Sequence, residues 1–393
     1  MALCTIRDVD WRGKTAVVRV DFNVPLGRQD GRVADDTRIR AALPTLQYLR
    51  ERGARVVLLS HLGRPDGKRD PKYSLQPVAD RLGELLGSPC PFGSDCVGQP
   101  AQSAVRAIGP GEVVLLENVR FHPEEEANDP AFAADLARLG DVFVNDAFGT
   151  AHRAHASTEG IAHDLLAVAG LLMEKEIVTI GGALEDPRRP FVAIVGGAKV
   201  SSKLAVLENL IDRVDRLLIG GGMANTFLAA RGLEVGHSLL EADLVPTARD
   251  LMARGGKIVL PADLVVTTDL KSSDAHPRVC AADGVGTEDI IADIGPQAAA
   301  EFGAAIDDAG TVLWNGPMGI FEDPRFADGT LQVARAMAAS PATTIVGGGE
   351  SVQAVEQAGV ADKLSHVSTG GGASLEFIEG KLLPGVAALK ADC

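Results

Sequence analysis

The stretch from Phe191 to Lys203 constrains the fold of this chain more than any other. Phe191–Val195 is apolar and rich in β-branched residues, which indicates a strand buried on both faces. Two glycines then predict a tight turn, and Lys199 and Lys203 are expected four residues apart on one face of the next helix. A strand, a glycine turn and two cations near a helix N-terminus indicate a polyanion site. On this stretch alone, a tight turn with two solvated lysines remains the alternative.

The first half of the chain alternates apolar strands with amphipathic helices. The expected strands are 16–20, 56–60, 113–116 and 142–144, and the expected helices are 36–52, 75–86 and 135–139. This alternation predicts a parallel sheet with helices between its strands.

Polar side chains gather where these strands end. At or just after the carboxyl ends lie Arg19, Asp21, Asn23, His61, Arg64, Asn118, Arg120, Asn145 and Arg153. Any single arginine among them is more simply explained as a surface ion pair. Their shared position favours a ligand site, because ligands bind at this edge of open parallel sheets. Arg38, at the start of the first long helix, is expected to join them in an anion pocket.

The second half of the chain repeats a strand followed by a run of glycines. Three runs, at 220–222, 347–349 and 370–372, each precede an expected helix and offer backbone N–H groups to phosphate oxygens. Tight packing explains one such run, but three beside two lysines favour a nucleoside triphosphate. The pattern is not a P-loop, and it lacks the dinucleotide-binding fingerprint, which weakens a nicotinamide dehydrogenase reading.

Length and charge set the remaining bounds. With 393 residues, two domains are expected, and the net charge of -15 argues against nucleic acid or an anionic membrane as a partner. The five scattered cysteines fit a reducing cytosol better than a disulfide framework. We find neither a signal peptide nor a membrane span, and therefore expect a cytoplasmic protein.

Ten motifs of this chain resemble those of the phosphoglycerate kinase family, in the family's order. They are RVDFNVP, RIRAALP, SHLGRP, LLENVRFHPEEE, NDAFGTAHRAHAS, GGAKVSSK, GGGMANTFL, LWNGPMGIFE, VGGG and SHVSTGGGASLEFIEGK. The resemblance covers essentially the whole chain. It implies an α/β fold of two doubly wound, Rossmann-like parallel-sheet domains, separated by a cleft and joined by a helix. The implied divisions are 1–170 for 3-phosphoglycerate, with 384–393 returning to it, 171–189 as the helix and hinge, and 190–383 for the nucleotide.

The resemblance also assigns roles to residues of the first domain. Asp21 and Asn23 would hold the glycerate hydroxyl and nearby oxygens. A cationic set would clamp the phosphate and carboxylate, namely His61, Arg64, Arg120 and Arg153. Arg38 would reach the transferring phosphoryl group and is therefore expected to be both catalytic and substrate-binding.

In the second domain the implied residues surround the nucleotide. The phosphates would lie along Gly197, Ala198, Lys199, Lys203, Asn315, Gly348, Gly349 and Ser351, and Gly222 is also expected to bind the nucleotide. Pro317 would pack on the nucleoside and Glu322 would accept from the ribose hydroxyls. Lys199, Lys203, Gly371 and Gly372 would act on the transferring group. Glu350 stands where the family usually carries Asp, so it is the expected ligand of Mg²⁺ despite its extra methylene.

The implied reaction is reversible phosphoryl transfer between ATP and 3-phosphoglycerate, giving ADP and 1,3-bisphosphoglycerate (EC 2.7.2.3). It would serve glycolysis, gluconeogenesis or carbon fixation, with Mg²⁺ as cofactor and a monomeric enzyme. Two rival hypotheses remain at this stage. One is the nicotinamide dehydrogenase, and the other is a non-catalytic, two-lobed protein that binds anions without ATP.

Overall fold

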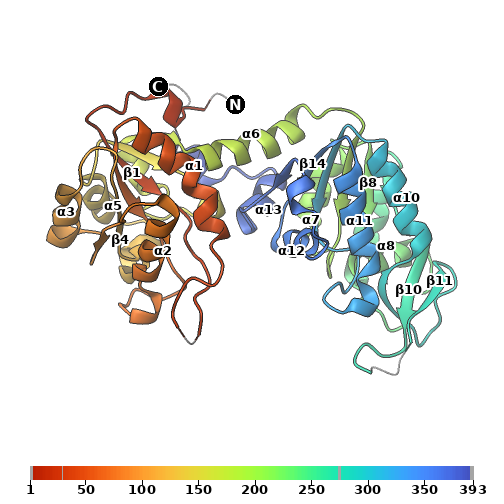
Figure 1. The fold of residues 1–393 in the computed structure, drawn as a ribbon. Helices are drawn as coiled ribbons and strands as arrows, with labels where there is room; N and C mark the ends of the chain where they lie inside the picture. The colour runs from red at the N-terminus through yellow and green to blue at the C-terminus, as the bar shows by residue number, and fades with distance from the viewer. Residues whose placement is uncertain (1–2, 29, 273–275, 390–393) are drawn as a thin grey trace. The chain divides into compact units, whose positions relative to one another are not determined.

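The structure is a computed structural model that describes residues 3–28, 30–272 and 276–389 (Figure 1). The chain divides into two compact units. One holds the described part of Met1–Val178 and Leu382–Cys393, and the other is Thr179–Lys381. The division falls inside a single helix, α6 (Leu171–Glu185).

A six-stranded parallel sheet forms the centre of the first unit. Its spatial order is β3-β4-β2-β1-β5-β6, and every pairing is parallel. The strands are β1 (Thr15–Arg19), β2 (Arg55–Leu59), β3 (Phe92–Gly93), β4 (Val113–Leu116), β5 (Val142–Asn145) and β6 (Leu166–Ala169). The short edge strand β3 and the strand β6 were not predicted. The central strands are buried almost throughout, as expected where helices cover both faces.

Helices alternate with the strands of the first unit. They are α1 (Thr37–Glu51), α2 (Gln76–Leu86), α3 (Gly98–Ala107), α4 (Pro123–Glu126), α5 (Pro130–Ala137) and α14 (Pro384–Ala387). In α1, the buried Ile39, Leu46 and Leu49 recur at helical spacing and join the core. The helix predicted at 135–139 instead begins at Pro130. The Asp129 side chain caps it by accepting from the N–H of Phe132 at 2.9 Å.

The second unit is built in the same way. Its parallel sheet has the order β15-β14-β13-β7-β8-β9. The strands are β7 (Phe191–Val195), β8 (Arg216–Ile219), β9 (Ile258–Val259), β13 (Thr311–Asn315), β14 (Thr343–Val346) and β15 (His366–Val367). The helices are α7 (Leu204–Ile211), α8 (Met223–Ala230), α9 (Val245–Ala253), α10 (Pro296–Asp307), α11 (Asp328–Ala339), α12 (Gly349–Gln357) and α13 (Gly372–Ile378). The prediction of two parallel-sheet α/β domains is confirmed.

Two features of the second unit differ from the sequence prediction. A three-stranded antiparallel sheet, β10 (Asp263–Thr267), β11 (Arg278–Ala281) and β12 (Ile290–Ile294), was not predicted. The placement of Lys199 and Lys203 on one helix is wrong, because α7 begins at Leu204. The chain turns first, since Gly197 has a φ of +112° and the N–H of Ser201 donates to Glu241 at 3.0 Å.

The first turn of α6 is capped by a buried carboxylate. Asp146 Oδ1 accepts from the N–H of Leu172 at 2.9 Å and from that of Met173 at 3.2 Å, and Thr45 Oγ1 accepts from Leu171 at 2.9 Å. Burial raises the pKa of Asp146 to about 6, although these donors and Thr45 oppose the shift. The cap therefore contains a carboxylate that is costly to ionise.

We expect Asp146→Asn to flatten the pH dependence of stability. The pKa of Asp146 is about 6 in the folded protein and 3.8 in the unfolded chain. Its contribution to the free energy of unfolding is therefore fully present below pH 3.8 and is lost as the pH rises through about 6. The loss amounts to about 3 kcal/mol across that window. Asn keeps an oxygen for the two N–H groups but cannot ionise. Denaturant unfolding at pH 4 and pH 7.5 measures the difference. Asp141→Asn, which also removes a carboxylate that accepts a backbone N–H, is the control and should keep the parent slope.

The described end of the chain packs on the first unit. The N–H of Gly385 donates to the carbonyl of Ala151 at 2.8 Å, and Asn145 Nδ2 donates to the carbonyl of Gly385 at 3.2 Å. A Cβ at Gly385 would lie 2.9 Å from Thr158 Cγ2, so the contact needs glycine. Of the segment 384–393 expected to return to this domain, residues 390–393 lie outside the described residues.

The expectation that the cysteines are reduced is wrong for Cys4. Cys4 forms a disulfide bond, which its isolated position in the sequence did not predict, whereas Cys90, Cys96 and Cys280 are free. Within the described ranges, no helix is long and apolar enough to cross a bilayer.

Candidate functional site

The loop after β1 places Asp21 and Asn23 beside other chain segments. Asp21 forms an ion pair with Arg38 from the start of α1. Asn23 Oδ1 accepts from the N–H of Gly63, which follows β2, at 2.9 Å. Gly63 has a φ of +63° and Tyr73 lies where a Cβ would stand, so only glycine fits here. Residues from two strand ends are thus joined at one edge of the sheet.

Arg120 is held in the same edge by the 3-10 turn Val119–Phe121 after β4. Its guanidinium donates to the carbonyl of Gly63 at 2.9 Å and forms an ion pair with Glu126 at 3.1 Å. The Asn118 side chain caps the turn by accepting from the N–H of Arg120 at 3.1 Å. Burial lowers the pKa of Arg120, with Glu126 opposing it. The buried stem and fixed contacts make this cation rigid.

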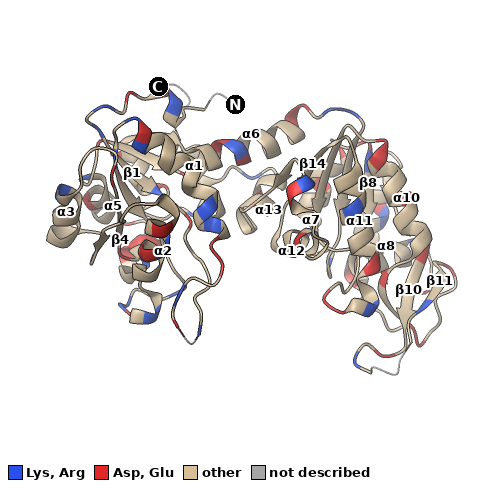
Figure 2. Cartoon of the chain, viewed as in Figure 1, with Lys and Arg blue, Asp and Glu red and all other residues tan. Residues whose placement is uncertain are grey.

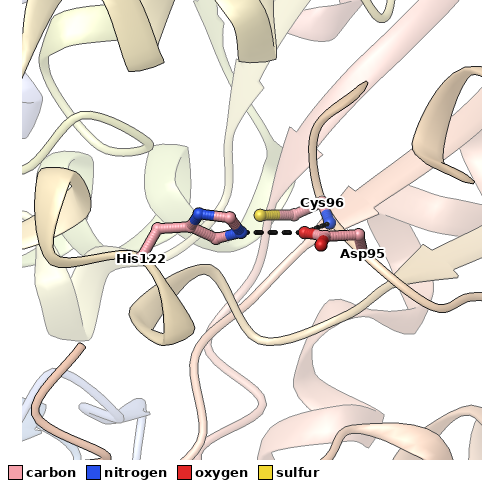
Figure 3. Close-up of side chains that lie close together, drawn as sticks. All are labelled: Asp95, Cys96 and His122. Carbon is pink, nitrogen blue, oxygen red and sulfur yellow. Dashed lines mark hydrogen bonds and ion pairs between the residues drawn. The ribbon is translucent and has the colours of Figure 1, made fainter. Parts of the chain in front are cut away.

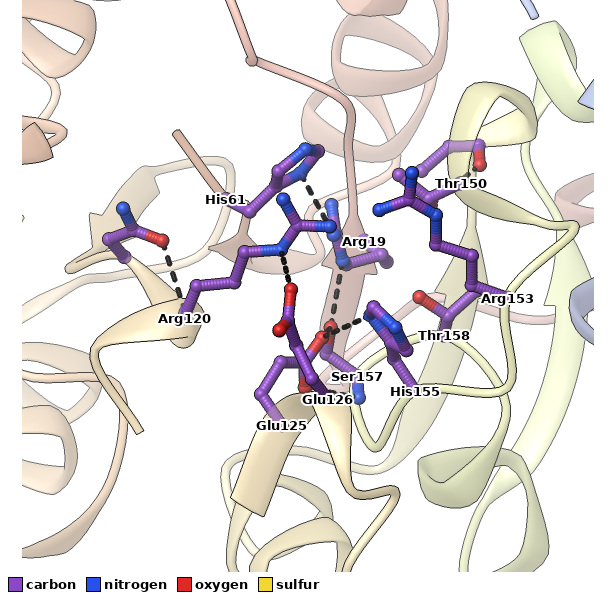
Figure 4. A network of polar contacts seen from close by, with 12 residues as sticks. Arg19, His61, Arg120, Glu125, Glu126, Thr150, Arg153, His155, Ser157 and Thr158 are labelled. Atoms are coloured by element: carbon purple, nitrogen blue, oxygen red, sulfur yellow. Dashed lines mark hydrogen bonds and ion pairs between the residues drawn. The ribbon is translucent and has the colours of Figure 1, made fainter. Parts of the chain in front are cut away.

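His61 lies among the cations of this edge (Figure 4). It is 4% exposed, and Arg19 is hydrogen-bonded to its Nδ1 at 3.2 Å. Burial first, and then the charges of Arg19, Arg120, Arg38 and Arg153, hold the pKa of His61 well below its usual value. The imidazole is therefore neutral at pH 7. Arg38, from the start of α1, and Arg153 thus act on His61 through their charges.

Two further arginines of the predicted set, Arg153 and Arg64, have fewer protein contacts than Arg120. Arg153 donates from Nε to His152 Nε2 at 3.1 Å, and Figure 4 shows its guanidinium on the Arg19 side of the network. Arg64 follows Gly63 and is exposed. An exposed arginine beside buried ones can close on an anion from the solvent side.

A buried acidic partner behind these cations was missed by the sequence analysis. Glu125 is fully buried in α4, where its carboxylate accepts from the N–H of Ser157 at 2.8 Å and from its hydroxyl at 2.6 Å. Burial raises the pKa of Glu125, and Arg19 is the main opposing charge. The sequence contained a signal for this buried acid, because Arg19 ends a strand that is mainly apolar. A buried arginine requires a buried acid.

In the second unit, Lys203 and the glycine turns share one cavity of about 230 Å³. The Lys203 ammonium donates to Asn315 Oδ1, and Asn315 Nδ2 donates to the carbonyl of Gly347 at 2.8 Å. The cavity is lined by Lys203, Asn315, Gly316, Gly348, Gly349, Glu350, Ser351, Gly371, Gly372 and Leu375. Burial lowers the pKa of Lys203, whereas Glu350 and Glu379 oppose it. A cation, glycine backbone and a carboxylate therefore line one cavity.

A larger cavity of about 530 Å³ lies in the same unit. Gly197, Ala198, Gly222 and Glu322 line it, together with apolar side chains from β10, β12 and their neighbours. Pro317 fixes the turn through its carbonyl, which accepts from the N–H of Gly197 at 2.9 Å. This mainly apolar space with few polar groups has the character of a small-molecule pocket. The unpredicted antiparallel sheet supplies much of its wall.

Two charged residues of the predicted set, Lys199 and Glu350, are exposed. Lys199 lies in the turn before α7, where its carbonyl accepts from the Ser202 hydroxyl at 2.8 Å. Glu350 lies in the first turn of α12 and faces the 230 Å³ cavity. Basic and acidic residues are interspersed over each unit (Figure 2), so an anion must rely on these local cations rather than on the net charge of -15.

A third cluster joins Asp95, Cys96 and His122, whose ligand atoms lie within 4.8 Å of one another (Figure 3). Protein donors already occupy its carboxylate. Asp95 accepts from the N–H of Cys96 at 2.7 Å, from His122 at 2.8 Å and from Arg69 at 3.3 Å. Burial raises the pKa of the Cys96 thiol well above its usual value. Hydrogen bonding therefore explains this cluster without a metal.

The fold and the two groups of residues define an α/β protein with cationic side chains at the strand ends of one unit and a cavity lined by a lysine and glycine turns in the other. Comparisons with known proteins agree with this class. The family model described as phosphoglycerate kinase matches residues 6–381. The phosphoglycerate kinase of Chloroflexus aurantiacus is 61% identical, with 98% of each chain covered, and that of Moorella thermoacetica is 58% identical, with 99% of each covered. The solved phosphoglycerate kinase of Coxiella burnetii gives a TM-score of 0.91 at 42% identity, with 98% of each chain covered.

The chain belongs to the phosphoglycerate kinase family. Membership makes it a kinase, an enzyme that transfers a phosphoryl group from ATP and that works with a divalent metal.

Proposed function

We propose that this enzyme transfers a phosphoryl group reversibly between ATP and the carboxylate of 3-phosphoglycerate. The observation that carries the proposal is the pairing of two sites within one chain. The cationic edge of the first unit suits a small acceptor with two anionic groups, a phosphate and a carboxylate. The Lys203 cradle of the second unit suits the phosphates of a nucleotide.

The chemistry needs little beyond positioning and charge. The acceptor carboxylate is ionised at neutral pH, so no general base is required in the direction of acyl phosphate formation. The transition state is loose and spreads negative charge over three equatorial oxygens. We assign the stabilisation of that charge to Lys203, Lys199, Arg38 and the N–H groups of Gly371 and Gly372.

The remaining roles follow from position. Asp21 and Asn23 bind the hydroxyl end of the acceptor, and its phosphate and carboxylate are held by His61, Arg64, Arg120 and Arg153. In the second unit, the nucleotide phosphates lie along Gly197, Ala198, Asn315, Gly348, Gly349 and Ser351. Pro317, Gly222 and Glu322 are assigned to the nucleoside side of the larger cavity.

The divalent metal is proposed to be Mg²⁺, bound with the nucleotide phosphates. The chain fits this ion, because Glu350 offers a hard carboxylate oxygen at the edge of the cavity of about 230 Å³. When bound, Mg²⁺ neutralises phosphate charge and orients the terminal phosphate. Glu350 is one methylene longer than the family's usual Asp, so its carboxylate reaches further from α12.

We expect Glu350→Ala to weaken Mg-ADP binding about 10-fold or more, because it removes an anionic oxygen from the metal's surroundings. Titration calorimetry with Mg-ADP, and with ADP in excess EDTA, measures the loss. Only the Mg-dependent affinity should fall, and Glu350→Asp should restore it. Glu356→Ala, an exposed glutamate further along α12, is the control. Equal Mg-ADP affinity in the parent and Glu350→Ala would remove the metal role of Glu350.

In-line transfer requires the acceptor carboxylate and the terminal phosphate to meet. We therefore propose that the competent state brings the two sites face to face, with water excluded and residues 171–189 acting as the hinge. We also propose a cytoplasmic monomer.

The decisive assay couples ADP release from ATP to the presence of 3-phosphoglycerate. We expect turnover with 3-phosphoglycerate and only background rates with glycerate and 2-phosphoglycerate. Equal rates with all three compounds, or no turnover, would refute the proposed substrate.

A further inference from the structure

We infer that Arg19 is a positioning residue that fixes the neutral His61 ring in the tautomer with its proton on Nε2. The inference concerns the free protein, and its consequence for substrate rests on the proposed function. It adds a residue to the acceptor site that makes no contact with substrate and acts through another side chain.

Each guanidinium nitrogen of Arg19 serves a different partner (Figure 4). Arg19 ends β1 and is 1% exposed. Its Nε donates to Ser157 Oγ at 2.8 Å, one terminal nitrogen donates to the carbonyl of Val20, and the other contacts His61 Nδ1 at 3.2 Å. This planar fork, anchored at three points, cannot rotate without breaking buried hydrogen bonds.

The tautomer of His61 follows from the donors. A guanidinium has only N–H donors and no acceptor, so His61 Nδ1 must accept and carries no proton. Burial and the surrounding arginines keep the pKa of His61 well below its usual value, so the ring is neutral. Its single proton is therefore on Nε2. A neutral Nε2–H can donate to a phosphate or carboxylate oxygen without adding a further charge to a crowded cationic site.

Glu125 supplies the counter-charge that keeps Arg19 buried. The Ser157 hydroxyl accepts from Arg19 Nε and donates to Glu125 at 2.6 Å, so its proton position is determined. The chain of contacts runs from the Glu125 carboxylate through Ser157 and Arg19 to His61. A second histidine, His155, lies 3.9 Å from Glu125, and burial lowers its pKa to about 4. It is therefore neutral at pH 7 and does not replace Arg19 as the cationic partner of Glu125.

Nitrogen-15 NMR of the full chain with labelled histidine tests the tautomer directly at pH 7. The His61 signals are assigned from their absence in His61→Gln. We expect one protonated nitrogen, Nε2, and one unprotonated nitrogen, Nδ1, in the ligand-free parent. A proton on Nδ1, or on both nitrogens, would overturn the inference, and this measurement needs no folded Arg19 variant.

The Arg19→Lys variant tests the positioning role. A single ammonium on a shorter stem cannot hold Ser157, Val20 and His61 together, so the His61 nitrogen signals should move toward a mixture of tautomers. The KM for 3-phosphoglycerate should rise about 10-fold, the effect of one lost hydrogen bond, with a smaller change in kcat. Unchanged tautomer and KM in a folded Arg19→Lys protein would overturn the role.

A matched control separates positioning from a general effect of arginine loss. Arg50→Lys, in the same unit, changes an arginine that donates to Gly111 and Ser88, and it should leave the His61 spectrum and the KM unchanged. A merely structural Arg19 would lower the melting temperature without moving the tautomer. If the parent fails to turn over 3-phosphoglycerate, the proposed function falls, but the NMR result still decides the state of His61.

Discussion

The Lys203→Met variant is expected to lower kcat by on the order of 100-fold or more, with a smaller change in the affinity for nucleotide. The Lys203 ammonium donates to Asn315 and lines the cavity that Gly348 and Gly372 also line. The Lys203 side chain is half-buried. Solvent therefore does not compensate for the loss of its ammonium charge when methionine is substituted. The negative charge that spreads over the equatorial oxygens then loses its nearest fixed cation.

Single-turnover measurement of ADP formation, with calorimetric titration of Mg-ADP, separates the chemical step from binding. The control is Lys257→Met, which removes another partly buried lysine of the same unit, one whose ammonium donates to the carbonyl of Ile211 at 3.0 Å. The control should keep near-parent kcat. A Lys203→Met protein that binds Mg-ADP and turns over at the parent rate would show that this lysine takes no part in transfer.

The Arg38→Ala variant is expected to lower kcat by about 100-fold while the fold remains intact. The Arg38 side chain is 38% exposed, and its described partner is Asp21, whose side chain is 12% exposed. The pair is partly buried, but the Arg38 end is open to solvent that screens its charge, so its contribution to stability is modest and the melting temperature should change by only a few degrees. Catalysis should suffer more, because the charge that Arg38 stabilises develops during transfer.

Arg40→Ala provides the comparison, because Arg40 lies two positions further along the same helix and pairs with Asp36 instead. Steady-state rates for the two alanine variants should differ by about the full 100-fold. Similar rates would mean that Arg38 is one surface cation among others.

Much of the first unit's candidate site can be predicted from the residues at which its strands end. Buried runs such as Val113–Leu116 lead directly into polar residues, and parallel strands bring those residues to one edge. Strand ends alone therefore predict that Asp21, His61 and Arg120 lie at one edge of the sheet. The motif resemblance then supplied the family, which the comparisons confirm.

Other features depend on contacts between distant parts of the chain. The start of α7 was misplaced because local spacing favoured a helix at Lys199, whereas Glu241 holds Ser201 in a turn. The antiparallel sheet was missed because its strand β11 is mostly exposed and lacks a strong apolar pattern. Glu125 was not singled out, because nothing in the run Glu124–Glu126 distinguishes it, and only its burial beside Ser157 identifies it.

The contact of Gly385 with Ala151 and Asn145 has a consequence for biosynthesis. The ribosome translates β5, which ends at Asn145, and the following segment with Ala151 long before it translates Gly385. A nascent chain therefore holds the first unit incomplete while all of Thr179–Lys381 is translated. These two segments therefore gain their hydrogen bonds to Gly385 only after the second unit has been translated.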